Sequence, residues 1–118
     1  MKRILVIEDD LEIQEGLQDL LEAEGYDVMI AGDGSLGANF AMHFNPDLIL
    51  CDISMPGFNG WQVLGLIKKF KVAAPLIFLT AQATPDDIQK GIEMGASAYL
   101  TKPYLREELL EVISRLLS

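Results

Sequence analysis

The sequence predicts an α/β domain in which helices cover both faces of a parallel β-sheet. Five short apolar runs, rich in Ile, Leu and Val, alternate with five segments whose apolar residues recur at helical spacing. Strands and helices that alternate in this way are joined by right-handed crossovers, which favour parallel strands. The 118 residues can form one hydrophobic core, and no linker, repeat or low-complexity segment divides them, so we expect one domain over residues 1–118.

The expected strands differ in how apolar they are, and this indicates where each lies in the sheet. Residues 48–51 are apolar throughout, which is typical of a strand buried on both faces. Residues 27–31 alternate and are less apolar, which indicates an edge strand. In chain order, the expected strands are residues 4–7, 27–31, 48–51, 75–79 and 97–100.

The expected helices are recognised by their apolar spacing and by the residues at their ends. Gly25 is suited to end the first helix in a left-handed conformation. We expect the second helix to bury Leu36, Phe40 and Phe44, and the third to bury Phe70, because these residues share a face with other apolar positions. In chain order, the expected helices are residues 11–24, 36–44, 61–70, 85–94 and 105–117.

Charge and composition exclude several classes of function. The formal net charge is −9 and the isoelectric point is near 4.4, which argues against direct binding of nucleic acid through phosphate contacts. No apolar stretch reaches the roughly 18–20 residues of a membrane span, and no signal-peptide pattern follows Met1. The single cysteine, Cys51, cannot form a disulfide framework. We expect a cytoplasmic domain without membrane contact.

Polar side chains follow four of the five expected strands at the point where each strand ends. Glu8 and Asp9 follow the first strand, Asp52 the third, Thr80 the fourth and Lys102 the fifth. The carboxyl ends of parallel strands lie at one edge of the sheet, where α/β folds place their sites. The sequence therefore predicts that three carboxylates, a hydroxyl and an ammonium group converge there.

This combination of groups favours phosphoryl transfer. Crowded carboxylates repel one another, and a divalent cation relieves that repulsion. Oxygen ligands of this kind suit Mg²⁺, which leaves positions open for a phosphoryl oxygen. Lys102 and Thr80 can bind the remaining phosphoryl oxygens, and Asp52 is the candidate nucleophile that forms an acyl phosphate.

The chain resembles the response-regulator receiver domains of two-component signalling over its whole length. The resemblance implies a flavodoxin-like (βα)5 fold with strand order 2-1-3-4-5, whose switch point lies between the first and third strands. The motifs that carry it are Glu8-Asp9, Asp52 followed by Met55-Pro56-Gly57 and Gly60, Thr80-Ala81, and Lys102-Pro103.

The resemblance assigns a role to each acidic residue of the site. It implies that Asp52 accepts a phosphoryl group from a phosphohistidine. It also implies that Asp9, Asp52 and the backbone carbonyl of Ser54 ligate Mg²⁺, while Glu8 acts through a water molecule. Asp10 is expected to start the following helix rather than to bind metal.

Further positions acquire roles through the same resemblance. Lys102 would contact the phosphoryl group and Asp52, and its bond to the following proline would be cis. Thr80 would move to bind the phosphoryl group while Tyr99 turns inward as the aromatic part of the switch. Ser54 and Gln82 occupy the two variable positions that tune the lifetime of the phosphoryl group.

The implied partners are those of a signalling domain rather than of a conventional enzyme. A histidine kinase or phosphotransfer protein would supply the phosphoryl group, and a downstream protein or attached output domain would respond. The domain would catalyse only its own phosphoryl transfer and slow dephosphorylation. It would be a monomer or a weak dimer that depends on phosphorylation.

Three other classes of protein agree less well with the pattern. Phosphatases of the haloacid-dehalogenase type need a second Asp two positions after the nucleophile, where this chain has Ser54. A flavodoxin-like cofactor site needs Gly, Ser or Thr after the first strand, whereas residues 8–10 are all acidic and would repel a phosphate. A receiver-like module used only for protein binding usually lacks part of the site, and no part is missing here.

Overall fold

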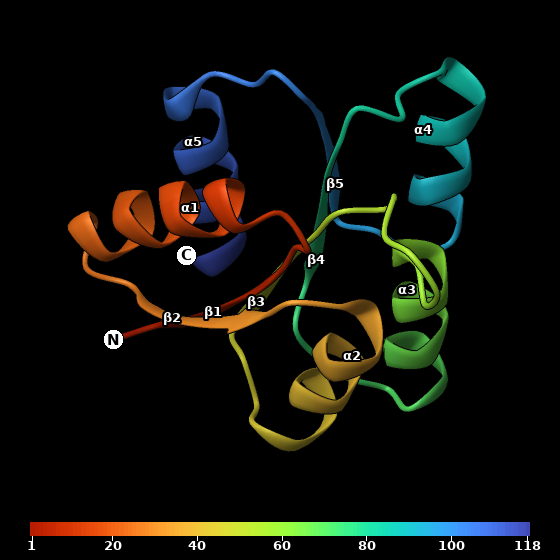
Figure 1. Ribbon diagram of the computed structural model, residues 1–118, viewed down its shortest axis with the longest axis horizontal. Coiled ribbons are helices and arrows are strands. Elements are labelled where there is room, and N and C mark those ends of the chain that lie inside the picture. The colour runs from red at the N-terminus through yellow and green to blue at the C-terminus, as the bar shows by residue number, and fades with distance from the viewer.

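The computed structural model describes residues 1–118 and consists of one sheet with helices on both faces (Figure 1). The five strands are parallel and lie in the order β2-β1-β3-β4-β5, the order that the receiver resemblance implies. In chain order the elements are β1 Arg3–Ile7, α1 Leu11–Ala23, β2 Asp27–Ala31, α2 Gly34–His43, β3 Leu48–Cys51, α3 Gly60–Lys69, β4 Leu76–Thr80, α4 Pro85–Glu93, β5 Ala98–Thr101 and α5 Arg106–Leu117.

The strands contribute side chains to two hydrophobic cores, one on each face of the sheet. In β1, Leu5 and Ile7 belong to the core beneath α2 and α3, whereas Ile4 and Val6 belong to the core beneath α1 and α5. Successive side chains of a strand point to opposite faces, so a central strand must be apolar at every position. β3 meets this requirement, since all its residues are buried, while the edge strand β2 is mostly half-exposed, as predicted.

The register of the strands determines which polar residues meet at the carboxyl edge. Ile7 of β1 pairs with Cys51 of β3, so the residues that follow each of them leave the sheet side by side. On the other side, Thr80 of β4 pairs with Thr101 of β5. β4 and β5 each lie about one residue later in the chain than the apolar pattern predicts, which places Thr80 inside its strand.

The prediction for the buried face of α2 is wrong for Leu36 and Phe44, but Phe40 packs against the core, partly buried. Leu36 and Phe44 are 40% and 47% exposed, and the helix instead buries Gly34, Gly37, Ala38 and Ala41. A Cβ atom at position 37 would lie 2.5 Å from the side chain of Ile7, so α2 approaches β1 too closely for large residues. Leu36 and Phe44 therefore remain at the rim of the helix.

The ends of three other helices, α3, α4 and α5, differ in their burial and capping. Phe70, expected to be buried, is 56% exposed, because it lies beyond the end of α3 and outside its packed face. Thr84 caps α4 with a reciprocal pair of hydrogen bonds, in agreement with the predicted helix start. Leu105, at the start of α5, makes no capping hydrogen bond and is 70% exposed.

Candidate functional site

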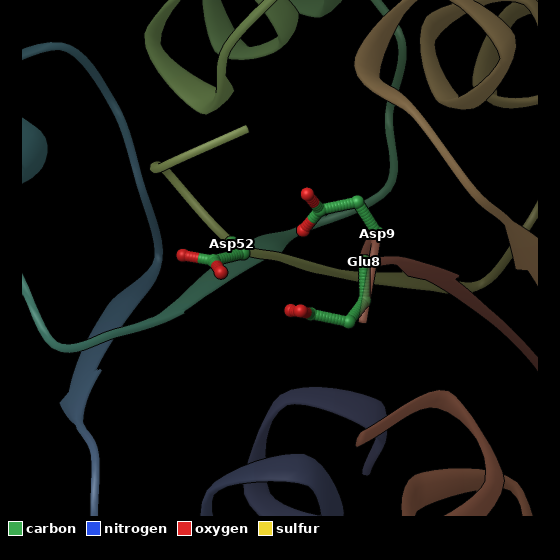
Figure 2. Close-up of side chains that lie close together, drawn as sticks. All are labelled: Glu8, Asp9 and Asp52. Atoms are coloured by element: carbon green, nitrogen blue, oxygen red, sulfur yellow. The ribbon is translucent and has the colours of Figure 1, made fainter. Parts of the chain in front are cut away.

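The site is built where β1 and β3 end beside each other. The backbone N–H of Asp52 donates to the carbonyl of Ile7 at 3.1 Å, which continues the strand pairing by one residue. Glu8, Asp9 and Asp52 each offer a carboxylate oxygen, and these oxygens lie within 4.8 Å of one another. Figure 2 shows the three side chains directed into the same space, two from the end of β1 and one from the end of β3. The structure thus brings together the three carboxylates that the sequence singled out.

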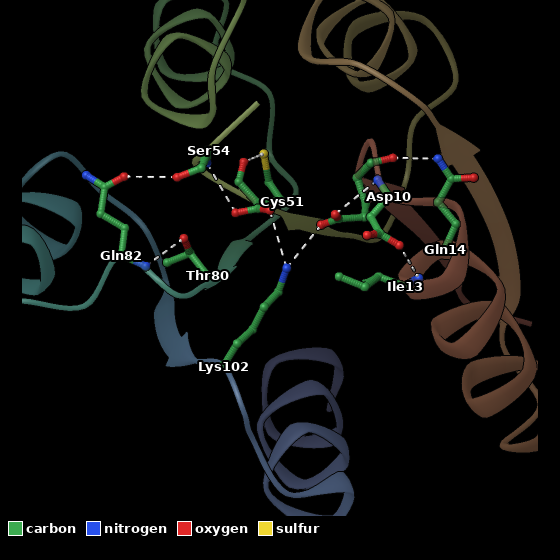
Figure 3. Close-up of polar contacts among 10 residues, drawn as sticks. Asp10, Ile13, Gln14, Cys51, Ser54, Thr80, Gln82 and Lys102 are labelled. Atoms are coloured by element: carbon green, nitrogen blue, oxygen red, sulfur yellow. Dashed lines mark hydrogen bonds and ion pairs between the residues drawn. The ribbon is translucent and has the colours of Figure 1, made fainter. Parts of the chain in front are cut away.

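The three carboxylates differ in their exposure to solvent. Glu8 is 3% exposed and Asp52 is 9% exposed, whereas Asp9 is open to solvent. Lys102 reaches both buried groups, with its Nζ atom 3.4 Å from Oε2 of Glu8 and 3.3 Å from Oδ2 of Asp52 (Figure 3). One ammonium group therefore bridges the two buried acids, while the third acid faces the opening.

Burial and charge together shift the protonation of this cluster. Burial raises the pKa of Glu8 to about 7, and the charge of Asp52 acts in the same direction, although Lys102 partly offsets both. Burial acts to lower the pKa of Lys102, but the two carboxylates outweigh it and the pKa is raised. The site therefore holds a firmly charged cation next to an acid that gives up its proton only near neutral pH.

The loop after β3 is shaped by turn residues that follow Asp52. The backbone N–H of Ser54 donates to Oδ1 of Asp52 at 3.2 Å, which orients the carboxylate. Gly57 adopts a φ of 74°, in the left-handed region that favours glycine. A Cβ at Gly60 would lie 2.5 Å from the carbonyl oxygen of Asp52, so α3 begins in close contact with the site.

A second network connects the end of β4 to the loop after β3. The N–H of Gln82 donates to Oγ1 of Thr80 at 3.1 Å, and Oγ of Ser54 donates to Oε1 of Gln82 at 3.3 Å (Figure 3). The side-chain amide of Gln82 also donates to Asp87 in the first turn of α4 at 3.4 Å. The hydroxyl of Tyr99 donates to the carbonyl of Gln82. Gln82 therefore contacts the site, α4 and β5 at once.

Some of these contacts could not be anticipated from the sequence. The side-chain amide of Gln14 donates to the carbonyl of Glu8 at 2.6 Å, and its position in the first turn of α1 is the only signal for this role. Asp87, in the first turn of α4, accepts a hydrogen bond from the side-chain amide of Gln82, and no local pattern indicates this contact. Asp10 accepts from the N–H of Ile13 at 3.1 Å and so caps α1, as predicted.

The structure confirms one prediction about an individual position and establishes the surroundings of Cys51. The peptide bond between Lys102 and Pro103 is cis, as the resemblance implies. Cys51 is fully buried, and this burial raises the pKa of its thiol, so it behaves as a small apolar residue rather than as a nucleophile.

The geometry supports attack by a carboxylate on a phosphoryl group. Asp52 lies at the mouth of the sheet, and the ammonium of Lys102 lies 3.3 Å from its Oδ2 atom. The hydroxyl of Thr80 and the ammonium of Lys102 lie at neighbouring strand ends and can bind oxygens of an incoming anion. Such a set supplies positioning and neutralisation of charge, which dominate phosphoryl transfer.

Comparison with known proteins identifies the family. Residues 4–114 match the model of the response regulator receiver domain. The chain is 38% identical over 118 residues to the probable transcriptional regulator ycf29 of Pyropia yezoensis, covering 98% of this chain and 53% of that protein. It is 40% identical over 108 residues to the transcriptional regulatory protein DltR of Streptococcus agalactiae, covering 92% of this chain and 48% of that protein.

Solved structures agree with this match. The non-phosphorylated HemR receiver domain of Leptospira biflexa superposes with a TM-score of 0.92 at 34% identity, covering 100% of this chain and 95% of that one. The chain belongs to the response regulator receiver domains and is a phosphoacceptor domain of two-component signalling. It spans about half the length of the curated relatives it matches. No helix of the structure is both long and apolar enough to cross a bilayer.

Proposed function

We propose that Asp52 is the residue that accepts the phosphoryl group. The observation that carries this proposal is the contact of Lys102 with Asp52, at 3.3 Å, in a site where two further carboxylates face the same space. Asp52 is also held by both the ammonium group of Lys102 and the backbone N–H of Ser54. These contacts leave a carboxylate oriented toward the opening of the site.

The acidic cluster has the chemistry of a Mg²⁺ site. Glu8, Asp9 and Asp52 are hard oxygen donors within 4.8 Å of one another. Burial and then the charge of Asp52 raise the pKa of Glu8, and a bound cation would counter both effects. Asp9 and Asp52 would hold the ion directly together with the carbonyl of Ser54, and Glu8 would act through water. When bound, Mg²⁺ supplies positive charge that draws the phosphoryl oxygens toward Asp52.

The transfer step is a substitution at phosphorus. A carboxylate oxygen of Asp52 forms a bond to the phosphorus atom as the bond from phosphorus to the donor imidazole nitrogen breaks, and the leaving imidazole retains the electron pair. Lys102 stays beside Asp52 and binds a phosphoryl oxygen. Thr80, whose hydroxyl now accepts from Gln82, would turn to donate to another phosphoryl oxygen, and Tyr99 would respond to that movement.

The partners follow from this chemistry and from the relatives. We propose that a histidine kinase or phosphotransfer protein donates the phosphoryl group, and that residues 1–118 act as one receiver domain. The output is a downstream protein or an attached domain, since two relatives are transcriptional regulators of about twice this length. The domain works in the cytoplasm as a monomer or a weak phosphorylation-dependent dimer, and it catalyses only its own phosphoryl transfer and slow dephosphorylation.

The phosphoacceptor assignment is tested by labelling with a small phosphoryl donor. Wild-type protein incubated with acetyl phosphate and Mg²⁺ should gain one phosphoryl group, seen as a mass increase, and Asp52→Asn should gain none because the amide is not a nucleophile. Asp19→Asn, which removes an exposed acid on α1, should be labelled like the wild type. Labelling of the Asp52→Asn variant at the wild-type level would contradict the assignment.

The metal assignment is tested by the effect of Mg²⁺ on thermal unfolding. Binding to the folded state alone raises the midpoint temperature, and ten times more ion than the dissociation constant contributes about 1.4 kcal/mol. Asp9→Asn should lose most of this increase. Asp10→Asn removes the same charge one residue away but keeps a good cap for α1, so it should respond to Mg²⁺ as the wild type does. Equal loss in both variants would indicate general charge attraction instead of a site.

A further inference from the structure

Trp61, the only tryptophan of the chain, lies next to the site without belonging to it. It follows Gly60, which contacts the backbone of Asp52 closely at the start of α3. Its indole packs edge-on against the ring of Phe78 in β4, with the ring centroids 5.2 Å apart. Trp61 is therefore one residue away from the loop that carries Asp52 and in direct contact with the core of the sheet.

Phe78 connects Trp61 to Tyr99. The rings of Phe78 and Tyr99 also pack edge-on, with centroids 5.8 Å apart, and Phe78 is completely buried between its two partners. Trp61, Phe78 and Tyr99 thus form a continuous aromatic row beneath α3 and α4. Interiors of this kind are close-packed, so a movement of Tyr99 changes the contacts of Phe78 and, through it, those of Trp61.

Helix α4 touches both ends of this aromatic row through two adjacent residues. The ammonium of Lys90 lies 4.3 Å from the centroid of the Trp61 ring. At Gly91, a Cβ atom would lie 2.9 Å from the ring of Tyr99 and 3.6 Å from that of Phe78. A displacement of α4 would therefore alter the surroundings of Tyr99 and the Lys90–Trp61 contact together.

The contact between Lys90 and Trp61 matters because α4 is otherwise weakly attached. Gly91 is the only buried residue of this helix, and Figure 1 shows α4 at the edge of the molecule beside β5 and α3. Elements with few buried apolar contacts open and shift most easily. The cation–π contact of Lys90 with Trp61 therefore ties α4 directly to α3.

We propose that Lys90 and Trp61 are positioning residues of the switch. Their contact belongs to the arrangement in which Tyr99 is turned inward and binds the carbonyl of Gln82, which is the arrangement that the phosphoryl group favours, and it breaks when α4 moves away from α3. The inference rests on the proposed function of Asp52 and Tyr99. An exposed cation–π contact changes the ratio of the two arrangements, with and without the contact, about 2- to 5-fold. The apparent affinity for a ligand that binds the arrangement with the contact changes by the same factor.

The fluorescence of Trp61 reports changes in its own surroundings, so it can be used to test the proposal. The full chain is titrated with beryllium fluoride at saturating Mg²⁺ while Trp61 emission and the amide signals of Asp52 and Tyr99 are recorded. Wild-type emission should change with the same midpoint as the amide signals. Lys90→Met keeps a long side chain but removes the cation, so its apparent affinity should fall about 2- to 5-fold. Lys90→Arg should restore the affinity, because a guanidinium also stacks on an indole.

A matched control separates the contact from a general effect of charge. Lys69 makes the other cation–ring contact of the chain, 5.6 Å from the ring centroid of Phe70 at the opposite end of α3, and Lys69→Met should bind as the wild type does. The inference is overturned if Lys90→Met binds beryllium fluoride as tightly as the wild type, or if both Met variants bind it equally weakly. The proposed function would stand in either case. If the wild type shows no response at Asp52, the inference and the proposed function both fail.

Discussion

At the scale of single residues, the site depends on how Glu8, Asp52 and Lys102 share charge. The two acids are almost completely buried, yet only one cation bridges them. Burying a charge without full compensation is costly, and Glu8 responds with a pKa of about 7. Negative charge in the cluster is therefore incompletely compensated once Glu8 ionises.

We expect Glu8→Gln to stabilise the metal-free protein above neutral pH. The pKa of Glu8 is raised by folding, so its contribution to stability is complete below about pH 4.5 and is lost as the pH rises through about 7. Glutamine keeps the shape and removes the charge, so at pH 8 the variant should exceed the wild type by about 1–3 kcal/mol in the free energy of unfolding.

The measurement is urea denaturation in the presence of EDTA at pH 4.5 and pH 8. The difference between Glu8→Gln and wild type should be small at the lower pH and appear at the higher one. Glu111→Gln, on the exposed side of α5, should show no such dependence. A Glu8→Gln variant that is equally stable or less stable at pH 8 would mean that the ionised Glu8 is well compensated by Lys102.

At the scale of elements, α2 and α3 each contain a glycine inside the helix, and the two glycines differ in the space available for a side chain. Gly37 of α2 faces Ile7 with no space for a side chain, because α2 lies close against β1. Gly65 of α3 has no atom within 4 Å of the position of a Cβ and is exposed to solvent. Helix propensity alone treats both positions alike, and only the distance between helix and sheet distinguishes them.

We expect alanine at these two positions to change stability in opposite directions. Gly37→Ala should lower the free energy of unfolding by about 1–3 kcal/mol, because Ile7 or the helix must move. Gly65→Ala should raise it by about 0.5–1 kcal/mol, because alanine loses less conformational entropy in a helix. Chemical denaturation of both variants checks this, and stabilisation by both would show that α2 can move away from β1 at little cost.

At the scale of the whole molecule, the two hydrophobic cores are joined by the sheet between them. Each central strand contributes alternate side chains to both faces, as β1 does with Leu5 and Ile7 on one side and Ile4 and Val6 on the other. If packing on one face is lost, the strands are destabilised, and the core on the other face is built from the same strands. The two layers should therefore unfold as one unit.

Leu109→Ala tests this coupling from the face opposite to Trp61. Leu109 of α5 is fully buried beneath the sheet, so its truncation should cost about 2–5 kcal/mol. Trp61 packs on the other core, yet its emission should report the same reduced urea midpoint as far-ultraviolet circular dichroism. A midpoint that falls by circular dichroism and stays unchanged by Trp61 emission would show that the faces unfold separately.

The order of elements and the place of the site could be predicted from the sequence alone. Apolar periodicity and turn residues act locally, so they indicated ten elements and a parallel sheet, with β2 at its edge. Since parallel strands end at one edge, the same pattern predicted that Asp52, Lys102 and the acids of β1 would meet. The resemblance to receiver domains added the strand order, which periodicity could not supply.

Other properties were decided only by the tertiary structure. The burial of small residues in place of Leu36 and Phe44 depends on how closely α2 approaches β1. The pKa of Glu8 depends on atoms 44 or more residues away in sequence, and the contact between Lys90 and Trp61 depends on the packing of two helices. Each of these is a distance between segments remote in the chain, and local sequence patterns carry no information about such distances.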